Sequence, residues 1–515
     1  MTSEVVEAEI NAAARIIGDI SVGIYRSPAN ALKELVSNSF DAGATEVFLS
    51  TDHPAFINVS CYDNGPGISI EELQTVFKYI GGSNKRVGRD TGPYGRPIIG
   101  KIGVGILAMS QIARRFVMIS SREGEDFRLE AEINIEEFVS REAARVNLGS
   151  GKIGHYKIFK IPEPPGTHYT IIATTAGSET VQANLGPGKS PRDYFARGRS
   201  DATTFKDFVL DLGRGSVPMT MTAHQSFIWE LAALCPVPYF DEGPVRGWSG
   251  WDHIKQALTS FNFSVLVDGY ELRKPILLPT AADLREVGDD YEIYPFRHED
   301  EDERGLHFEG YVFHQRKQIT PPELQGLLIR IRNVGIGGYD TSMLEYPRNI
   351  GPMVRGMTGE VYVHRGLEDA LNIDRNSFNQ THDHFLRLRE ALFRHLGLPG
   401  QRGITRDIRE RSRKHQVGLR ADKTSQALNT LIHRLQRVTG ERWEWEADHR
   451  IDGPLVIVAP RHIKINVQHD TVPGGSAARN EFFRVYLAAQ LLERKGEAPD
   501  GDAQGLVGWL RKLKL

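Results

Sequence analysis

Cysteine is scarce in this chain of 515 residues, which contains only Cys61 and Cys235. Two thiols are too few for a disulfide framework or a thiolate metal site, and they favour a reducing compartment. Long apolar runs are also lacking, so the sequence predicts no membrane-spanning helix. The N-terminal segment places acidic residues among its apolar ones, unlike a secretion signal. We therefore expect a cytoplasmic protein with no membrane partner.

Net charge is lacking as well, because 63 Lys and Arg are balanced by 66 Asp and Glu. The overall charge of −3 does not attract the protein as a whole to nucleic acid or to an anionic membrane, so any surface that binds them must be a local basic patch. An apolar fraction of 40% and a charged fraction of 25% are typical of soluble globular proteins. The length of the chain predicts more than one domain.

Changes in hydrophobic pattern divide the chain into five segments. Strand patterns dominate the first and third segments, whereas Gly, Pro, Ser and Arg interrupt the apolar periodicity in the second. The fold class that these patterns predict is α+β. We expect an α+β domain at 1–180, a loop or connector at 181–225, a second α/β domain at 226–396, a basic helical linker at 397–440 and a small C-terminal α/β domain at 441–515.

Two charged stretches interrupt this pattern. Residues 401–440 contain ten Lys or Arg against three Asp or Glu, on a segment that reads as helical. This segment is either a solvated connecting helix or a surface for nucleic acid or an acidic partner. The acidic run 299–303 is interpreted as a solvated loop tip.

A helix with a polar stripe is predicted from Pro28 onward. Ser27 is a suitable N-cap, and proline is favoured at the first helical position. Glu34, Asn38 and Asp41 then follow at i, i+4 and i+7, which places them on one helix face. An amide oxygen can ligate Mg²⁺ and a carboxylate can polarise an attacking water, although the same spacing also occurs on solvated helix faces.

Glycine-rich segments follow this helix. Asp63 ends a strand pattern and is followed by Gly65 and Gly67, so its carboxylate could accept a hydrogen bond from an exocyclic amine while the glycines admit a flat base such as adenine. The alternative is a tight turn after a strand. The segments 80–86 and 98–109 contain glycines before a helix-like run, which is a pattern for binding phosphate. The glycine-rich stretch between them reads as a mobile lid.

Four of these segments, ELVSNSFDA, DNGPGI, GKIGVG and the Gly-Thr pair at 166–167, resemble the ordered motifs of the GHKL ATPases. That superfamily includes the ninety-kilodalton heat-shock chaperones, MutL proteins, gyrase B, MORC proteins and sensor histidine kinases. The resemblance implies a Bergerat fold, which is a two-layer α/β sandwich, with ATP and Mg²⁺ as ligands. It also implies Glu34 as general base, Asn38 as the Mg²⁺ ligand and Asp63 as the acceptor for the adenine amine. The other nucleotide-contacting positions that we expect are Asp41, Gly65, Gly67, Ser83, Lys85, Lys101, Gly103, Val104, Gly105 and Thr167.

A second, looser resemblance lies at residues 359–378. This stretch is similar to the second-domain strand and loop of the heat-shock chaperones, in which an arginine reaches the terminal phosphate. Arg375 is the corresponding residue, although Asp374 stands where that family usually has serine. A structural or surface role for Arg375 therefore stays open, as does a solvated role for Lys85 and Lys101. The two resemblances cover roughly residues 1–396 and imply a ribosomal-protein-like transducer domain after the ATP-binding domain.

The function predicted from this set of motifs is Mg²⁺-dependent ATP hydrolysis in a clamp that forms a homodimer when ATP binds. The clamp would act on a protein client, on partner subunits or on nucleic acid held at 401–440. The alternative is an ATP-gated scaffold, or a subunit of a DNA-maintenance or defence complex, with little turnover of its own. A sensor kinase and a type II topoisomerase subunit are the other candidates. Labelled ATP separates the kinase from an ATPase, because a kinase retains the label on the protein.

Overall fold

The structure is a computed structural model, and its described residues fold as a mixed α/β protein in two compact units, Met1–Gln401 and Arg402–Leu515. The described residues are 3–13, 27–78, 96, 99, 109, 112–135, 150–175, 179–186, 188, 202–213, 221–246, 248, 250–251, 262–280, 290–302, 305–372, 375–439, 442, 444–448, 456–459 and 462–466.

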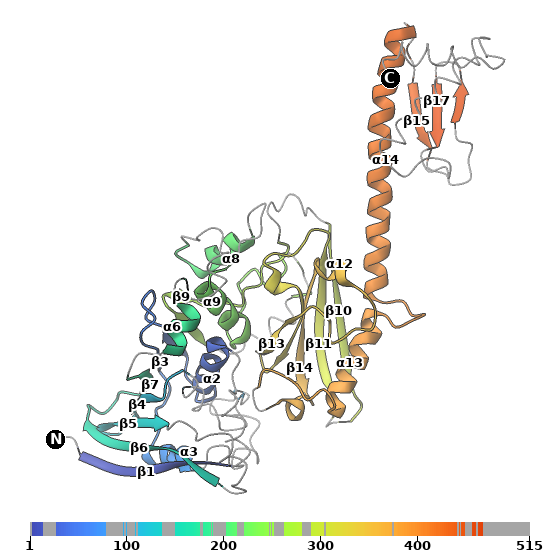
Figure 1. The fold of residues 1–515 in the computed structure, drawn as a ribbon. Helices are drawn as coiled ribbons and strands as arrows, with labels where there is room; N and C mark the ends of the chain where they lie inside the picture. The colour runs from blue at the N-terminus through green and yellow to red at the C-terminus, as the bar shows by residue number, and fades with distance from the viewer. Residues whose placement is uncertain are drawn as a thin grey trace. The chain divides into compact units, whose positions relative to one another are not determined.

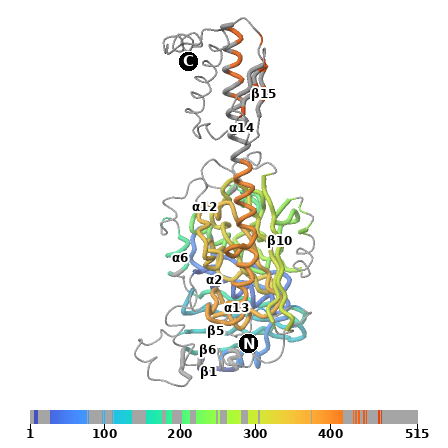
Figure 2. The backbone as a smooth tube through the Cα atoms, turned by 90° about the vertical axis from the view of Figure 1, so that its right-hand side faces the viewer, coloured from blue at the N-terminus to red at the C-terminus, as the bar shows by residue number. Residues whose placement is uncertain are grey.

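The first unit contains a nine-stranded sheet (Figure 1). Neighbouring strands are antiparallel except β2 and β8, which are parallel. Figure 2 shows β1, β6 and β5 running side by side at one end of this sheet. In sheet order the strands are β1 (Ser3–Ala13), β6 (Ser150–Pro162), β5 (Phe127–Ile135), β4 (Arg115–Ser121), β7 (Tyr169–Thr174), β3 (Ser60–Asp63), β2 (Glu46–Ser50), β8 (Ser264–Val267) and β9 (Tyr270–Glu271).

Helices bury one face of this sheet. Along β2, buried and exposed residues alternate, and the buried Val47 and Leu49 share a hydrophobic core with Leu32 and Val36 of helix α2 (Pro28–Asp41). This arrangement of helices against a sheet agrees with the predicted two-layer sandwich. The other helices of this layer are α3 (Ile70–Lys78), α6 (Glu179–Leu185), α8 (Phe205–Gly213) and α9 (Ala223–Leu234).

The structure differs from the sequence prediction in the segment 181–225. Most of α6 and all of α8 lie where a loop or connector was expected. Phe205, Phe208 and Leu212 have helical spacing and are buried in the core, so a short amphipathic pattern was missed among the Gly and Pro residues. The strand β8, which follows this segment by many residues, joins the first sheet beside β2.

A second sheet of five strands completes the first unit. The strands β12 and β14 are parallel, and the other neighbours are antiparallel. The core of the first sheet continues into this part through Tyr311, Phe313 and Val334. In sheet order the strands are β10 (Tyr291–Glu299), β11 (His307–Gln315), β14 (Met357–Arg365), β12 (Gly326–Ile331) and β13 (Val334–Asp340). The short helices are η3 (Pro322–Leu324), α12 (Gly351–Val354) and η4 (Glu368–Ala370), and the longer helix is α13 (Asp383–Leu396).

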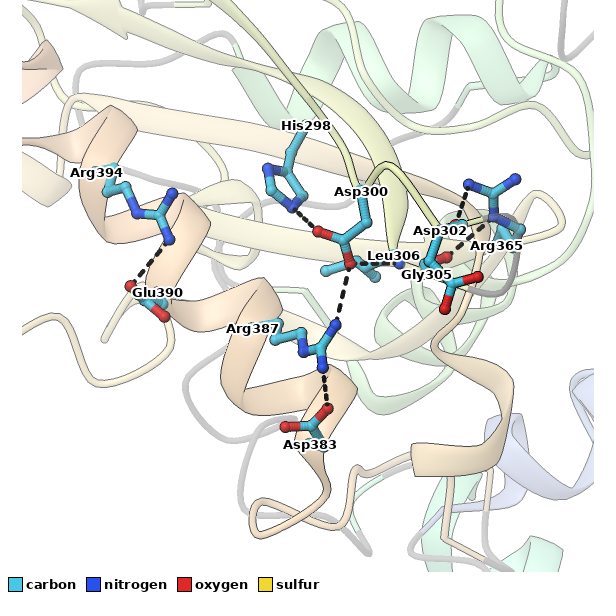
Figure 3. A network of polar contacts seen from close by, with 10 residues as sticks. All are labelled: His298, Asp300, Asp302, Gly305, Leu306, Arg365, Asp383, Arg387, Glu390 and Arg394. Carbon is cyan, nitrogen blue, oxygen red and sulfur yellow. Dashed lines mark hydrogen bonds and ion pairs between the residues drawn. The ribbon is translucent and has the colours of Figure 1, made fainter.

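The acidic run 299–303 lies at the β10–β11 turn, where Glu299, Glu301 and Asp302 are exposed as predicted, but Asp300 is held in place by other residues. Figure 3 shows the Asp300 carboxylate between a histidine, a backbone amide and an arginine. It lies 3.0 Å from Nε2 of His298, accepts the amide N–H of Leu306 at 2.8 Å and meets Arg387 of α13 at 3.5 Å. These contacts join the β10–β11 turn to α13, because a carboxylate with several acceptor sites can bind several donors.

The described part of the second unit consists of a long helix and a small sheet. Helix α14 (Ile404–Thr439) covers the basic segment that was predicted to be helical. The strands β15 (Glu444–Asp448), β17 (His462–Asn466) and β16 (Val456–Ala459) form a three-stranded sheet in that order. None of the described helices combines the length and apolarity needed to cross a membrane.

Candidate functional site

Helix α2 begins as its sequence predicts. The Ser27 hydroxyl accepts the amide N–H of Asn30, and Pro28 occupies the first turn. The helix ends at Asp41, and its C-cap Ala42 is followed by Gly43, whose φ of 93° lies in the left-handed region that favours glycine. These two ends fix which residues of α2 face the neighbouring elements.

Glu34 is buried in the middle of α2, which excludes a solvated helix face at this position. Its carboxylate is 1% exposed, and its Oε2 accepts a hydrogen bond from Nη1 of Arg375 at 2.8 Å. Arg375 follows the second sheet and has a φ of 50°, and its Nη2 donates to the carbonyl oxygen of Ile99. The structure therefore brings together the two residues that were predicted to be catalytic.

Asp63 lies at the end of β3 with its carboxylate oriented by two donors. The Ser39 hydroxyl of α2 donates to Oδ2 at 2.8 Å, and the amide of Gly65 donates to Oδ1 at 2.9 Å. Burial raises the pKa of Asp63 above its ordinary value, while these two hydrogen bonds oppose the rise. Each carboxylate oxygen retains a lone pair, so Asp63 can still accept a further hydrogen bond.

Close backbone approach explains the glycine at position 67. Its φ is 75°, and a Cβ built there would lie 2.0 Å from the carbonyl oxygen of Ser121 on β4. The Ser121 hydroxyl also lies 2.9 Å from the hydroxyl of Thr167, an exposed residue. Gly65, Gly67 and Thr167 therefore lie around the same strand ends as Asp63.

Asn38 and Asp41 occupy the later turns of α2. Asn38 is exposed, and its side chain makes no hydrogen bond within the described part of the chain. Asp41 is half-buried, and its Oδ1 accepts the amide N–H of Ile99 at 2.6 Å. Asp41 therefore supports the backbone next to the glycine-rich segment 100–105. Six predicted positions lie outside the described residues: Ser83, Lys85, Lys101, Gly103, Val104 and Gly105.

A small cavity of about 50 Å³ lies beside Glu34. The sequence reasoning missed Lys33 in its wall, a lysine that is 1% exposed and donates to Oδ1 of Asn376 at 2.7 Å. The sequence offered one signal for Lys33 and Asn376, because they stand next to the predicted Glu34 and Arg375 in the chain. The cavity is lined by Lys33, Glu34, Ile99, Ile331, Arg332, Val334, Ile336, Glu368, Leu371 and Arg375.

Known proteins resemble this part of the chain. Residues 25–153 match the family described as "Histidine kinase-, DNA gyrase B-, and HSP90-like ATPase". A putative type II restriction enzyme, HgiDII of Herpetosiphon aurantiacus, is 32% identical over 116 residues, which are 22% of this chain and 18% of that protein. The DNA mismatch repair protein MutL of Phenylobacterium zucineum is 31% identical over 120 residues, which are 22% of this chain and 19% of the relative.

The chain thus matches about a fifth of the length of these curated relatives. The matched segment holds α2, β2 and β3, and with them Glu34, Asn38 and Asp63. The motifs, the helix-covered sheet and the family match agree with one another. Residues 25–153 therefore form a domain of the histidine kinase-, DNA gyrase B- and HSP90-like ATPase family.

Proposed function

We propose that this chain binds ATP between α2 and the loop after β3, and that it hydrolyses ATP to drive a dimeric clamp. The observation that carries this proposal is the arrangement of α2. One turn of the helix holds Glu34 against Arg375, and a later turn holds Asp63 through Ser39. A single helix thus contacts residues at both the predicted adenine end and the predicted phosphate end of the site.

The residues would act in the following way. Asp63 accepts the adenine amine, with Gly65, Gly67 and Thr167 beside the base. Glu34 takes the proton of a water that attacks the terminal phosphorus, the bond from phosphorus to the bridging oxygen breaks, and ADP and phosphate leave. Arg375 offsets the negative charge on the transferring group.

The residues present also fit a magnesium ion. Mg²⁺ commonly takes one or two protein ligands and completes its shell with phosphate oxygens and water. Asn38 offers an exposed amide oxygen one turn from Glu34, and no group of three or more acidic, His or Cys side chains among the described residues could hold a metal by itself. Asn38 would therefore bind the ion together with the nucleotide, and the ion would neutralise phosphate charge.

Changing Asp63 to Asn tests the adenine end. The amide retains one acceptor oxygen but replaces the other with a donor, which faces the Ser39 hydroxyl, the Gly65 amide or the adenine amine. We expect ATP binding, measured by calorimetry, to fall below detection. Unchanged ATP affinity in a variant that still folds would contradict the role of Asp63 in binding adenine.

The proposal of an ATP-promoted homodimer is supported by the edge of the first sheet. Among the described residues, β1 pairs only with β6 and stands at the end of the strand order, so a strand of a second copy could pair with its other edge. We expect a non-hydrolysable ATP analogue to increase the dimer fraction, measured by light scattering. A molar mass that stays constant on addition of the analogue would argue against the clamp.

The setting of this activity is proposed from the relatives. Proteins named as a restriction enzyme and as DNA mismatch repair proteins suggest a DNA-maintenance or defence complex, with α14 as the candidate surface for nucleic acid. A subunit with little turnover of its own is the alternative. Phosphate release by the isolated chain distinguishes the two.

A further inference from the structure

Two neighbouring residues of α2 meet two neighbouring residues of the loop after the second sheet. Arg375 donates to Glu34 at 2.8 Å, and Lys33 donates in the opposite direction to Asn376 at 2.7 Å. Each element therefore supplies one donor and one acceptor. This reciprocal pattern fixes both the distance and the rotation of the loop relative to the helix, which a single contact cannot do.

The loop is shaped to present these two side chains together. The amide of Arg375 donates to the carbonyl of Asn372 at 3.0 Å, and the amide of Asn372 donates to the carbonyl of Ser377 at 3.0 Å. Arg375 has a φ of 50°, in the left-handed region that non-glycine residues seldom adopt. The contacts to α2 help to hold this conformation.

Lys33 is an unusual residue to find at this place. It is 1% exposed, and burial lowers the pKa of its ammonium group, while the neighbouring Glu34 opposes that shift. Asn376 is the only hydrogen-bond partner of Nζ among the described residues. Burying a lysine is unfavourable unless it is paired, so stability of the fold alone gives little reason for it.

The two oxygens of Glu34 have different surroundings. Oε2 is bound to Arg375, whereas Oε1 is buried and has no hydrogen-bond partner within the described structure. The cavity that Glu34 lines has a volume of about 50 Å³. A bound water needs roughly 10–15 Å³ of such space and polar partners, and both are present here.

We propose that Lys33 and Asn376 are positioning residues, which hold Arg375 on one oxygen of Glu34 and leave the other oxygen to accept the proton of the attacking water. This inference rests on the proposed ATPase function and adds two residues to it. Neither residue touches the reacting atoms. Both act through the placement of Arg375, so they should affect turnover far more than nucleotide affinity.

The test measures phosphate release at saturating ATP and ATP affinity by calorimetry. We expect Lys33→Met and Asn376→Ala each to lower kcat about ten- to a hundredfold, the loss that a misplacement near 1 Å causes, with unchanged affinity. The kcat of the double variant should be no lower than that of the less active single variant, because both changes break the same Lys33–Asn376 contact. Asn376→Asp keeps an acceptor oxygen for Lys33 and should restore turnover.

The control is Glu230→Gln on α9. Glu230 accepts hydrogen bonds from Ser27 and Asn30 at the start of α2, at 3.0 Å each, so this variant perturbs the first turn of the helix without removing either of the two contacts to the loop. We expect it to keep its kcat. Wild-type turnover in Asn376→Ala, or equal losses in affinity and kcat in all variants including the control, would overturn the positioning role.

The two proposals can fail separately. If the wild-type chain does not bind ATP, the proposed function fails. If the wild type hydrolyses ATP and Glu34→Gln does not, while Lys33→Met and Asn376→Ala remain fully active, only the positioning role fails. Thermal melting identifies a variant that does not fold. In that case Asn376→Asp tests the positioning role, because loss of turnover in that variant, if it is folded, contradicts the proposal.

Discussion

Glu34→Ala is expected to abolish phosphate release while ATP remains bound. A general base contributes about 10²- to 10⁴-fold to a rate, so the rate of phosphate release should fall by that factor. Affinity should persist because, in the proposed site, Asp63 and the glycines bind the other end of the nucleotide. The measurement pairs calorimetry with a phosphate-release assay. Equal loss of binding and hydrolysis would show that Glu34 is a binding residue.

The alanine variant leaves Arg375 without its carboxylate partner, so a second variant is required. Glu34→Gln keeps an acceptor for Nη1 of Arg375 and removes only the ability to take a proton. We expect the same loss of turnover with less effect on stability. Glu132→Gln, which changes an exposed carboxylate on β5, is the matched control and should remain active.

Glu360→Ala is expected to have the largest effect on stability. Glu360 and Arg330 are fully buried in the second sheet, and Oε1 of Glu360 accepts from Nε of Arg330 at 2.5 Å. Oε2 accepts the hydroxyls of Tyr239, Tyr311 and Tyr362 at 3.0, 2.9 and 2.8 Å. Removal of one partner from a buried pair costs about 3–5 kcal/mol, because the other charge is left uncompensated.

The measurement is urea unfolding of the full chain, followed by near-ultraviolet circular dichroism from the aromatic cluster. The double variant Arg330→Met with Glu360→Leu should recover much of the lost free energy of unfolding, since it leaves no unpaired charge. The control is Glu309→Gln on the neighbouring strand β11. Glu309 is partly exposed and pairs with His364, so this change should shift the midpoint little. A midpoint for Glu360→Ala equal to that of the wild type would contradict this account.

Local signals in the sequence predicted well the elements that carry the first half of the candidate site. Ser27 and Pro28 located the start of α2, and helical spacing identified Glu34, which meets Arg375 in the structure. Gly67 was predicted to admit a flat base, and this role stays a prediction, whereas the structure shows a close approach of Gly67 to the backbone of Ser121. These features depend on residues close together in the chain, and short-range rules describe them.

Long-range features could not be predicted in the same way. The Lys33–Asn376 contact joins residues 343 positions apart, and no periodicity specifies such a pair. The contacts of Asp300 in the acidic run 299–303 were missed because the arginine that binds it lies on α13, far along the chain. The helix α8 was missed because its apolar spacing is short and is surrounded by glycine and proline.

The parallel pairing of β2 with β8 has a practical consequence for producing this protein in pieces. Residues Glu46–Ser50 obtain one neighbour from Ser60–Asp63 and the other only from Ser264–Val267. A fragment cut near residue 225 would therefore expose the hydrogen-bonding groups of a central strand, which invites aggregation. The same exposure arises on the ribosome until the chain has been synthesised past residue 267. A soluble ATP-binding fragment should accordingly extend beyond Glu271, the last residue of the sheet.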